Sequence, residues 1–171
     1  MGGQTDLITG LPVTDREDEY VRQAVERLLL QRGYPPGQVQ VDAQRTLHIL
    51  DEPLTVRADL LVMVAGRAGL LLRCGRGSLV TRERQAVAAA RLIADPWPPL
   101  AVVCNGEDAE LLEVASGRVL DQGLGAVPDF NRLAELVESY PPHHPDDLQL
   151  QKAARVYAAF VSLQCPGQCI S

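Results

Sequence analysis

The sequence predicts an α/β fold in which a β-sheet is packed against helices and followed by a C-terminal helical extension. Two runs, residues 60–64 and 70–72, are apolar at every position, which is typical of central strands covered on both faces. Stretches with apolar residues at helical spacing precede and follow these runs. This alternation of strand and helix indicates a sheet with helices on its faces.

The N-terminal part predicts an arm, a helix and two short strands. Residues 1–16 are polar and contain glycine, so we expect a flexible N-terminal arm. A helix is expected over residues 17–31, where apolar side chains including Tyr20 recur with helical spacing before Gly33. Short strands are expected at residues 39–43 and 46–50.

The middle of the chain predicts the rest of the sheet. The link Ala65–Ala68 is short enough to join the two apolar runs as a hairpin. An alanine-rich helix is expected over residues 81–94, and a proline-rich break ends it. Residues 100–104 predict a buried strand, and residues 110–115 predict another after the turn Asn105–Gly106.

The C-terminal part predicts two helices, at residues 129–139 and 146–163, separated by a proline- and histidine-rich loop. We therefore divide the chain into the arm 1–16, an α/β domain 17–122 and a C-terminal helical extension 123–171. The extension is a candidate surface for a protein partner or for self-association. The low aromatic content of the chain, 4%, leaves few anchor candidates for such a contact beyond Trp97, Tyr157 and Phe160.

Basic residues are concentrated in one segment. The net charge of −6 argues against a chain built wholly for polyanions. Between Arg57 and Arg91, however, seven arginines stand against two acids, a local charge of +5. This segment predicts phosphate contacts with nucleic acid, and an ordinary solvated surface explains it equally well. Lys152 is the only lysine.

The cysteines do not predict a disulfide framework. Cys74 and Cys104 each end an apolar run, so we expect small buried side chains. Cys165 and Cys169 lack the spacing and the second cysteine pair of a zinc site. No apolar run is long enough to span a membrane and no secretory signal is visible, so the cytoplasm is the expected compartment.

Six short stretches, in their order and spacing, carry a resemblance to a known family. They are Glu19–Gln23, Arg32–Pro35, Arg57–Val62, Leu70–Leu72, Gln85–Ala86 and Val102–Glu107. The chain resembles the N-terminal nuclease domain of type I restriction enzyme R subunits, within the PD-(D/E)xK superfamily. The resemblance implies a restriction-endonuclease-like fold over residues 17–122, with a central mixed β-sheet flanked by helices.

The resemblance also implies an active site, of which this chain keeps only part. In the family an Asp begins one strand and a Glu-x-Lys sequence lies on the next, so that the three side chains converge on a divalent metal and a phosphate. Asp59 matches the Asp, but Arg73 replaces the Glu and Gly75 replaces the Lys. Glu19 and Gln85 match two further family positions.

The resemblance therefore predicts a domain that has lost its catalytic residues and its metal. An arginine beside Asp59 would repel a divalent cation, and we expect an Asp59–Arg73 or a Glu19–Arg73 ion pair instead. The resemblance then predicts an accessory that binds DNA or a protein. The candidate nucleic-acid-binding residues are Arg73, Arg76, Arg82 and Arg84.

Two alternatives remain open. The chain could be a magnesium-dependent endodeoxyribonuclease with rearranged ligands such as Glu19, Glu52 and Asp59. It could also be a structural or dimerising module. At the level of single residues, Asp59 could simply accept hydrogen bonds from local backbone groups at a strand start.

Overall fold

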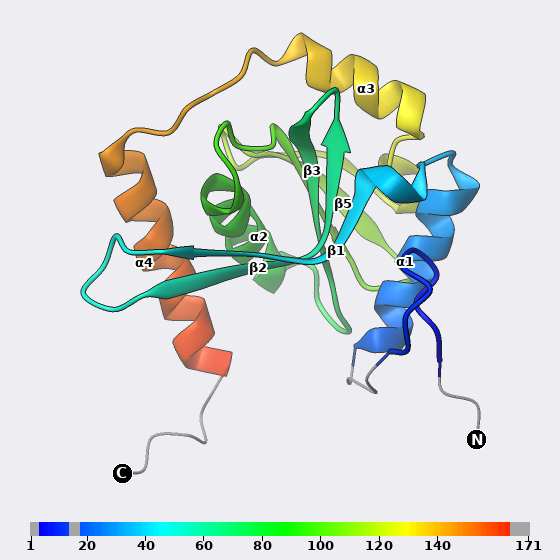
Figure 1. The fold of residues 1–171 in the computed structure, drawn as a ribbon, viewed down its shortest axis with the longest axis horizontal. Coiled ribbons are helices and arrows are strands. Elements are labelled where there is room, and N and C mark those ends of the chain that lie inside the picture. Colours follow the sequence, from blue (N-terminus) through cyan, green and yellow to red (C-terminus); the bar gives the residue numbers. More distant parts are fainter. Residues whose placement is uncertain (1–3, 14–17, 165–171) are drawn as a thin grey trace.

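A six-stranded sheet in the order β1-β2-β3-β4-β5-β6 forms the centre of the computed structural model, which describes residues 4–13 and 18–164 (Figure 1). The strands are β1 (Val39–Leu47), β2 (Leu54–Val64), β3 (Arg67–Cys74), β4 (Leu100–Cys104), β5 (Ala109–Glu113) and β6 (Val119–Gln122). Strands β3 and β4 pair in parallel and the other neighbours pair antiparallel. The predicted α/β class with a central mixed sheet is confirmed.

Helices cover both faces of this sheet. They are α1 (Glu19–Gln31), α2 (Val80–Ile93), α3 (Phe130–Ser139) and α4 (Asp147–Gln164), with short 3-10 turns at Pro36–Gln38 and Leu124–Ala126. Helix α2 connects the parallel strands β3 and β4 and packs with α4 on one face, where one apolar cluster forms. Helices α1 and α3 contribute to a second cluster on the other face. Figure 1 shows α1 and α4 on opposite sides of the molecule.

The strands differ from the sequence prediction in three places. Strand β1 runs unbroken through Gln44 and Arg45, because both residues keep their register with β2. Strand β2 begins at Leu54, before the apolar run, since its first half alternates between buried and half-exposed or exposed residues. Strand β6 was not predicted; it is short and largely exposed, and it therefore carries little apolar signal.

The N-terminal residues that the sequence assigned to a flexible arm include a folded turn. Residues 4–13 close on themselves through a bridge between Thr5 and Pro12. The amide of Leu7 donates to the side chains of Gln23 and Glu26 on α1, at 3.1 and 3.2 Å. Asp6 is buried. The turn is thus fastened to α1 by polar contacts, which hydrophobic periodicity does not report.

The C-terminal helices pack on the sheet, and two of the proposed aromatic anchors pack with them. Trp97 and Tyr157 are buried, so the expectation that they lie at a partner surface is wrong. Trp97 stacks on His143 with 4.2 Å between ring centroids, and the Tyr157 hydroxyl accepts a hydrogen bond from the amide of Arg57. Phe160 is half-buried. Across residues 4–13 and 18–164, no helix has the length and apolar character that crossing a membrane requires.

Helix α3 completes the core on its face of the sheet. Creating a cavity there should therefore lower the free energy of unfolding substantially. Leu133 is fully buried, so Leu133→Ala should lower the free energy of unfolding by about 2–5 kcal/mol. Urea denaturation measures this change. Glu138→Ala on the exposed side of the same helix is the control and should stay within about 0.5 kcal/mol of the wild type. Equal effects of the two substitutions would contradict the packing described.

Candidate nucleic-acid interface at the C-terminal end of strand β3

Asp59 and Arg73 face each other where β2 meets β3. They lie one step beyond the registered pair Leu60–Leu72, so their side chains share a face. The Nε atom of Arg73 is 3.7 Å from Oδ2 of Asp59. The predicted Asp59–Arg73 ion pair is therefore present, as a single contact rather than a bidentate one.

The carboxylate of Asp59 also has a backbone partner. Its Oδ2 atom accepts a hydrogen bond of 2.7 Å from the amide of Cys74. Arg73 in turn donates from Nη1 to the carbonyl of Arg57 at 3.1 Å. Asp59 thus has a local structural role, because it accepts a hydrogen bond from the backbone at the end of β3, and Arg73 balances its charge.

A second guanidinium lies directly over Gly75. A Cβ atom built on Gly75 would clash with the guanidinium of Arg82, so the Arg82 side chain occupies the space that a side chain at position 75 would enter. Arg82 comes from the first turn of α2 and donates from Nη2 to the carbonyl of Arg76 at 2.6 Å. A cation from α2 therefore lies over the first residue after β3, which carries no side chain.

The loop after β3 is held from two sides. The amide of Arg76 donates to Oδ1 of Asp18 at 3.1 Å, and the Arg76 guanidinium lies 3.4 Å from the same atom. On the other side, the Asn105 side chain donates to the carbonyl of Gly77 at 3.1 Å. These contacts fix the loop between α1 and the β4–β5 turn. They also gather Arg73, Arg76 and Arg82 at one end of the sheet.

Arg84 and Gln85 point away from this group. Arg84 lines a cavity of about 330 Å³ between α2 and α4, together with Arg91 and Lys152. Gln85 is buried. Of the four predicted nucleic-acid-binding residues, the structure thus brings three together and places Arg84 on the flank of α2.

Two further arginines of the basic segment bind backbone carbonyls away from the loop after β3. Arg67 donates to the carbonyls of Val137 and Tyr140, where α3 ends. Arg91 donates from Nε and Nη2 to the carbonyl of Val114, at 3.0 and 2.8 Å. The charge of +5 counted along the sequence therefore overstates the basic surface, because such guanidinium groups serve as hydrogen-bond donors inside the fold.

Glu19 pairs with Arg22 rather than with Arg73. Arg22 lies 2.6 Å from Glu19, 3.3 Å from Asp6 and 3.3 Å from Asp42. Burial alone would lower the pKa of Arg22, but its hydrogen bond to Glu19 and the charges of Asp42 and Glu19 outweigh burial and raise it. Arg22 and Asp42 were not singled out from the sequence. Their meeting depends on how α1 sits on β1, which local patterns do not encode.

Glu26 lies beneath this network, fully buried, and its Oε1 atom has no hydrogen-bond partner. Burial raises the pKa of Glu26 to about 8, and the nearby Asp6 charge adds to the rise while Arg22 opposes it. Burial also favours the neutral form of Asp6, but backbone amides of Thr9 and Ile8 outweigh it and hold the pKa of Asp6 below its usual value. At neutral pH Asp6 is the charged partner and Glu26 the neutral one.

A second carboxyl pair joins β5 to α2. Glu110 is buried and one of its carboxylate oxygens lacks a hydrogen-bond partner. Burial raises the pKa of Glu110 to about 7, and the adjacent carboxyl of Glu83 adds to the rise. In the part of the chain that the structure describes, no three side chains among His, Cys, Asp and Glu are grouped so that they could hold a metal ion.

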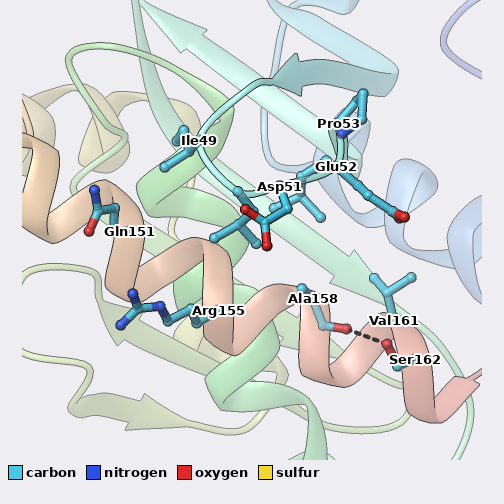
Figure 2. A pocket seen from close by; sticks show the side chains of 11 residues that line it. Ile49, Asp51, Glu52, Pro53, Gln151, Arg155, Ala158, Val161 and Ser162 are labelled. Carbon is cyan, nitrogen blue, oxygen red and sulfur yellow. Dashed lines mark hydrogen bonds between the residues drawn. The ribbon is translucent and has the colours of Figure 1, made fainter.

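Glu52 lies far from Asp59. It sits in the turn of the β1–β2 hairpin and lines a groove of about 560 Å³ against α4, with Asp51 and Arg155 (Figure 2). From Leu54 to Asp59 the strand alone advances roughly 17 Å at 3.3 Å per residue. The suggested ligand set of Glu19, Glu52 and Asp59 is therefore not assembled in this structure.

The predicted cysteine environments are confirmed where the structure describes them. Cys74 and Cys104 are free and buried, and burial raises the pKa of both thiols. Cys165 and Cys169 lie outside the described residues.

The fold and its partial site define an α/β domain in which Asp59 on β2 pairs with Arg73 beside the end of β3, close to further arginines. A comparison with protein families finds a match to the family described as type I restriction enzyme R protein N terminus, over residues 17–128. The match covers more than half of the chain, which therefore belongs to this family. Neither the curated proteins nor the solved structures contain a match.

The carboxyl of Glu26 predicts a stability that depends on pH. The folded state holds this proton up to about pH 8, whereas the unfolded chain releases it near pH 4.5. The stabilisation is therefore complete below about pH 4.5 and is lost as the pH rises through about 8. Glu26→Gln keeps a neutral side chain at every pH. Between pH 6 and pH 9 its free energy of unfolding should therefore rise by roughly 2 kcal/mol relative to that of the wild type. Urea denaturation at both pH values measures the gain.

Glu138→Gln provides the matched control, because Glu138 is exposed on α3. It should follow the wild-type pH dependence. If Glu26→Gln followed the wild type as well, Glu26 would not be the titrating group.

Proposed function

We propose that this chain is a catalytically inactive member of its family that binds DNA through the loop after β3. The observation that carries the proposal is the Arg82 guanidinium over Gly75, next to Arg76 and the Asp59–Arg73 pair. Permanent cations at one end of the sheet suit the negatively charged phosphates of a nucleic acid. Membership of a restriction-enzyme family adds to this argument.

The side chains present do not fit the magnesium ion that the resemblance implies. Magnesium prefers oxygen ligands, chiefly carboxylates and water. Asp59 offers one carboxylate whose Oδ2 is already engaged by the Cys74 amide and by Arg73. A second positive charge from Arg82 lies over the adjacent Gly75. Because these charges repel a divalent cation, we propose no metal-dependent reaction at this site.

The absence of cleavage is testable with a restored carboxylate. The wild-type protein should leave supercoiled plasmid uncut in magnesium or manganese and should show no manganese binding by calorimetry. Arg73→Glu places a second carboxylate opposite Asp59 and should gain measurable manganese binding, which Asp59→Asn in the same background should abolish. Wild-type cleavage that disappears in Asp59→Ala would show that the protein is instead an active nuclease.

DNA binding should be electrostatic and should depend on Arg82. Fluorescence anisotropy with a labelled oligonucleotide should give an affinity that falls as salt rises. Arg82→Ala should lower the slope of log K against log salt by about 1, while Arg82→Lys should retain most of it. Arg132→Ala is the control, because Arg132 is an exposed arginine on α3, whose last turn contacts Arg67 at the start of β3. Salt-independent binding, or equal losses in both alanine variants, would contradict the proposal.

A protein partner or self-association through the C-terminal helices stays a second prediction. Helix α4 leaves Leu148, Val156 and Val161 exposed, at 60%, 41% and 38% of their surface. Val156 and Val161 line the two grooves beside α4. Sedimentation analysis of the full chain over a range of concentrations distinguishes a monomer from a self-associating protein.

A further inference from the structure

We propose that Tyr20 is a stacking platform for an unpaired base, so that this surface prefers single-stranded DNA to duplex. The inference rests on the proposed function, because it assumes that the arginines at the β3 end contact a nucleic-acid backbone. It goes beyond that function by naming the form of nucleic acid. The exposed aromatic ring beside those arginines is the feature that requires an explanation.

The side chain of Tyr20 is exposed to solvent rather than packed in the core. It is the second residue of α1, and 57% of its surface is exposed, whereas its neighbours Glu19 and Val21 are buried. The sequence places Tyr20 among the apolar positions of the helix, yet the structure turns it outward. Aromatic residues make up only 4% of this chain, and the other tyrosines are either buried or half-buried.

The ring is already engaged by one of the candidate phosphate-binding arginines. The guanidinium carbon of Arg76 lies 6.0 Å from the Tyr20 ring centroid, within the range of a cation–π contact. Asp18 fixes Arg76 through its amide and its side chain, at 3.1 and 3.4 Å. The ring and the cation are thus held in one arrangement before any ligand arrives, which lowers the entropy cost of binding.

Tyr20 is contiguous with the guanidinium that carries the proposed function. Arg76 contacts the Tyr20 ring with its side chain and accepts from Arg82 with its carbonyl. A single residue therefore links the aromatic ring to the cation over Gly75. An aromatic face beside guanidinium groups matches the way single strands are bound, with bases stacked on rings and phosphates neutralised by basic side chains.

The geometry favours single strands because a duplex hides the faces of its bases. In a duplex each base is covered by its neighbours, so an exposed ring can only reach a base that is unpaired. Stacking is tolerant of sequence, since every base has a π face. We therefore expect the protein to prefer single strands to duplex, with little preference for base sequence.

The test compares the full chain on two probes at one salt concentration: a labelled single strand of mixed sequence and its duplex. The wild type should bind the single strand at least about 5-fold more tightly, in line with the worth of one stacked base. Tyr20→Ala should remove this preference and leave duplex affinity within about 2-fold, whereas Tyr20→Phe should keep it. Leu148→Ala, an exposed apolar residue on α4, is the matched control and should change neither affinity.

The outcomes separate this inference from the proposed function. Binding that depends on Arg82 but is indifferent to Tyr20→Ala overturns the stacking role alone. Equal losses on single strand and duplex in Tyr20→Ala also overturn it, because the ring would then not discriminate between them. No binding to either probe overturns both proposals. Circular dichroism of each variant confirms that the fold is retained.

Discussion

The carboxylate of Asp59 joins the middle of β2 to the end of β3, and the surface around it depends on that contact. One oxygen of Asp59 receives both the Cys74 amide and the Arg73 guanidinium, so the last residues of β3 are held against β2. The loop that carries Arg76 begins from this fixed point. The positions of Arg73 and Arg76 therefore depend on where β3 ends.

Arginine side chains have two roles in this protein: some bind backbone carbonyls, and others place positive charge near Gly75. Several guanidinium groups bridge backbone carbonyls: Arg45 reaches the end of α2, Arg67 the end of α3, and Arg91 the end of β5. A planar group with several donors suits such bridging better than an ammonium, which fits the scarcity of lysine. Arg82 uses the same reach to bring positive charge to Gly75, which has no side chain of its own.

Much of the fold could be predicted from the sequence, because continuous apolar runs mark covered strands. Strand β4 and helices α2, α3 and α4 follow the predicted ranges within a residue or two. The pairing of Asp59 with Arg73 followed from a resemblance and from strand alternation. The approach of Arg82 to Gly75 could not be predicted, since it depends on the path of a loop and the rotamer of a long side chain. The exposure of Tyr20 likewise depends on how α1 is rotated against the sheet, which a tyrosine among apolar residues does not disclose.

The contacts made by α3 bear on where the chain can be divided. Residues at and just past the end of the matched region are tied back into it: the Tyr34 hydroxyl donates to the Pro128 carbonyl, and the Phe130 amide donates to the Arg32 carbonyl. Leu133 and Val137 then cover the sheet face beside α1. A fragment cut at residue 122 would leave that apolar face open to water and prone to aggregate. A fragment that keeps this face covered must extend through Tyr140, whose carbonyl is held by Arg67, and it needs α4 as well, because Ala154 and Tyr157 cover the α2 side of the sheet.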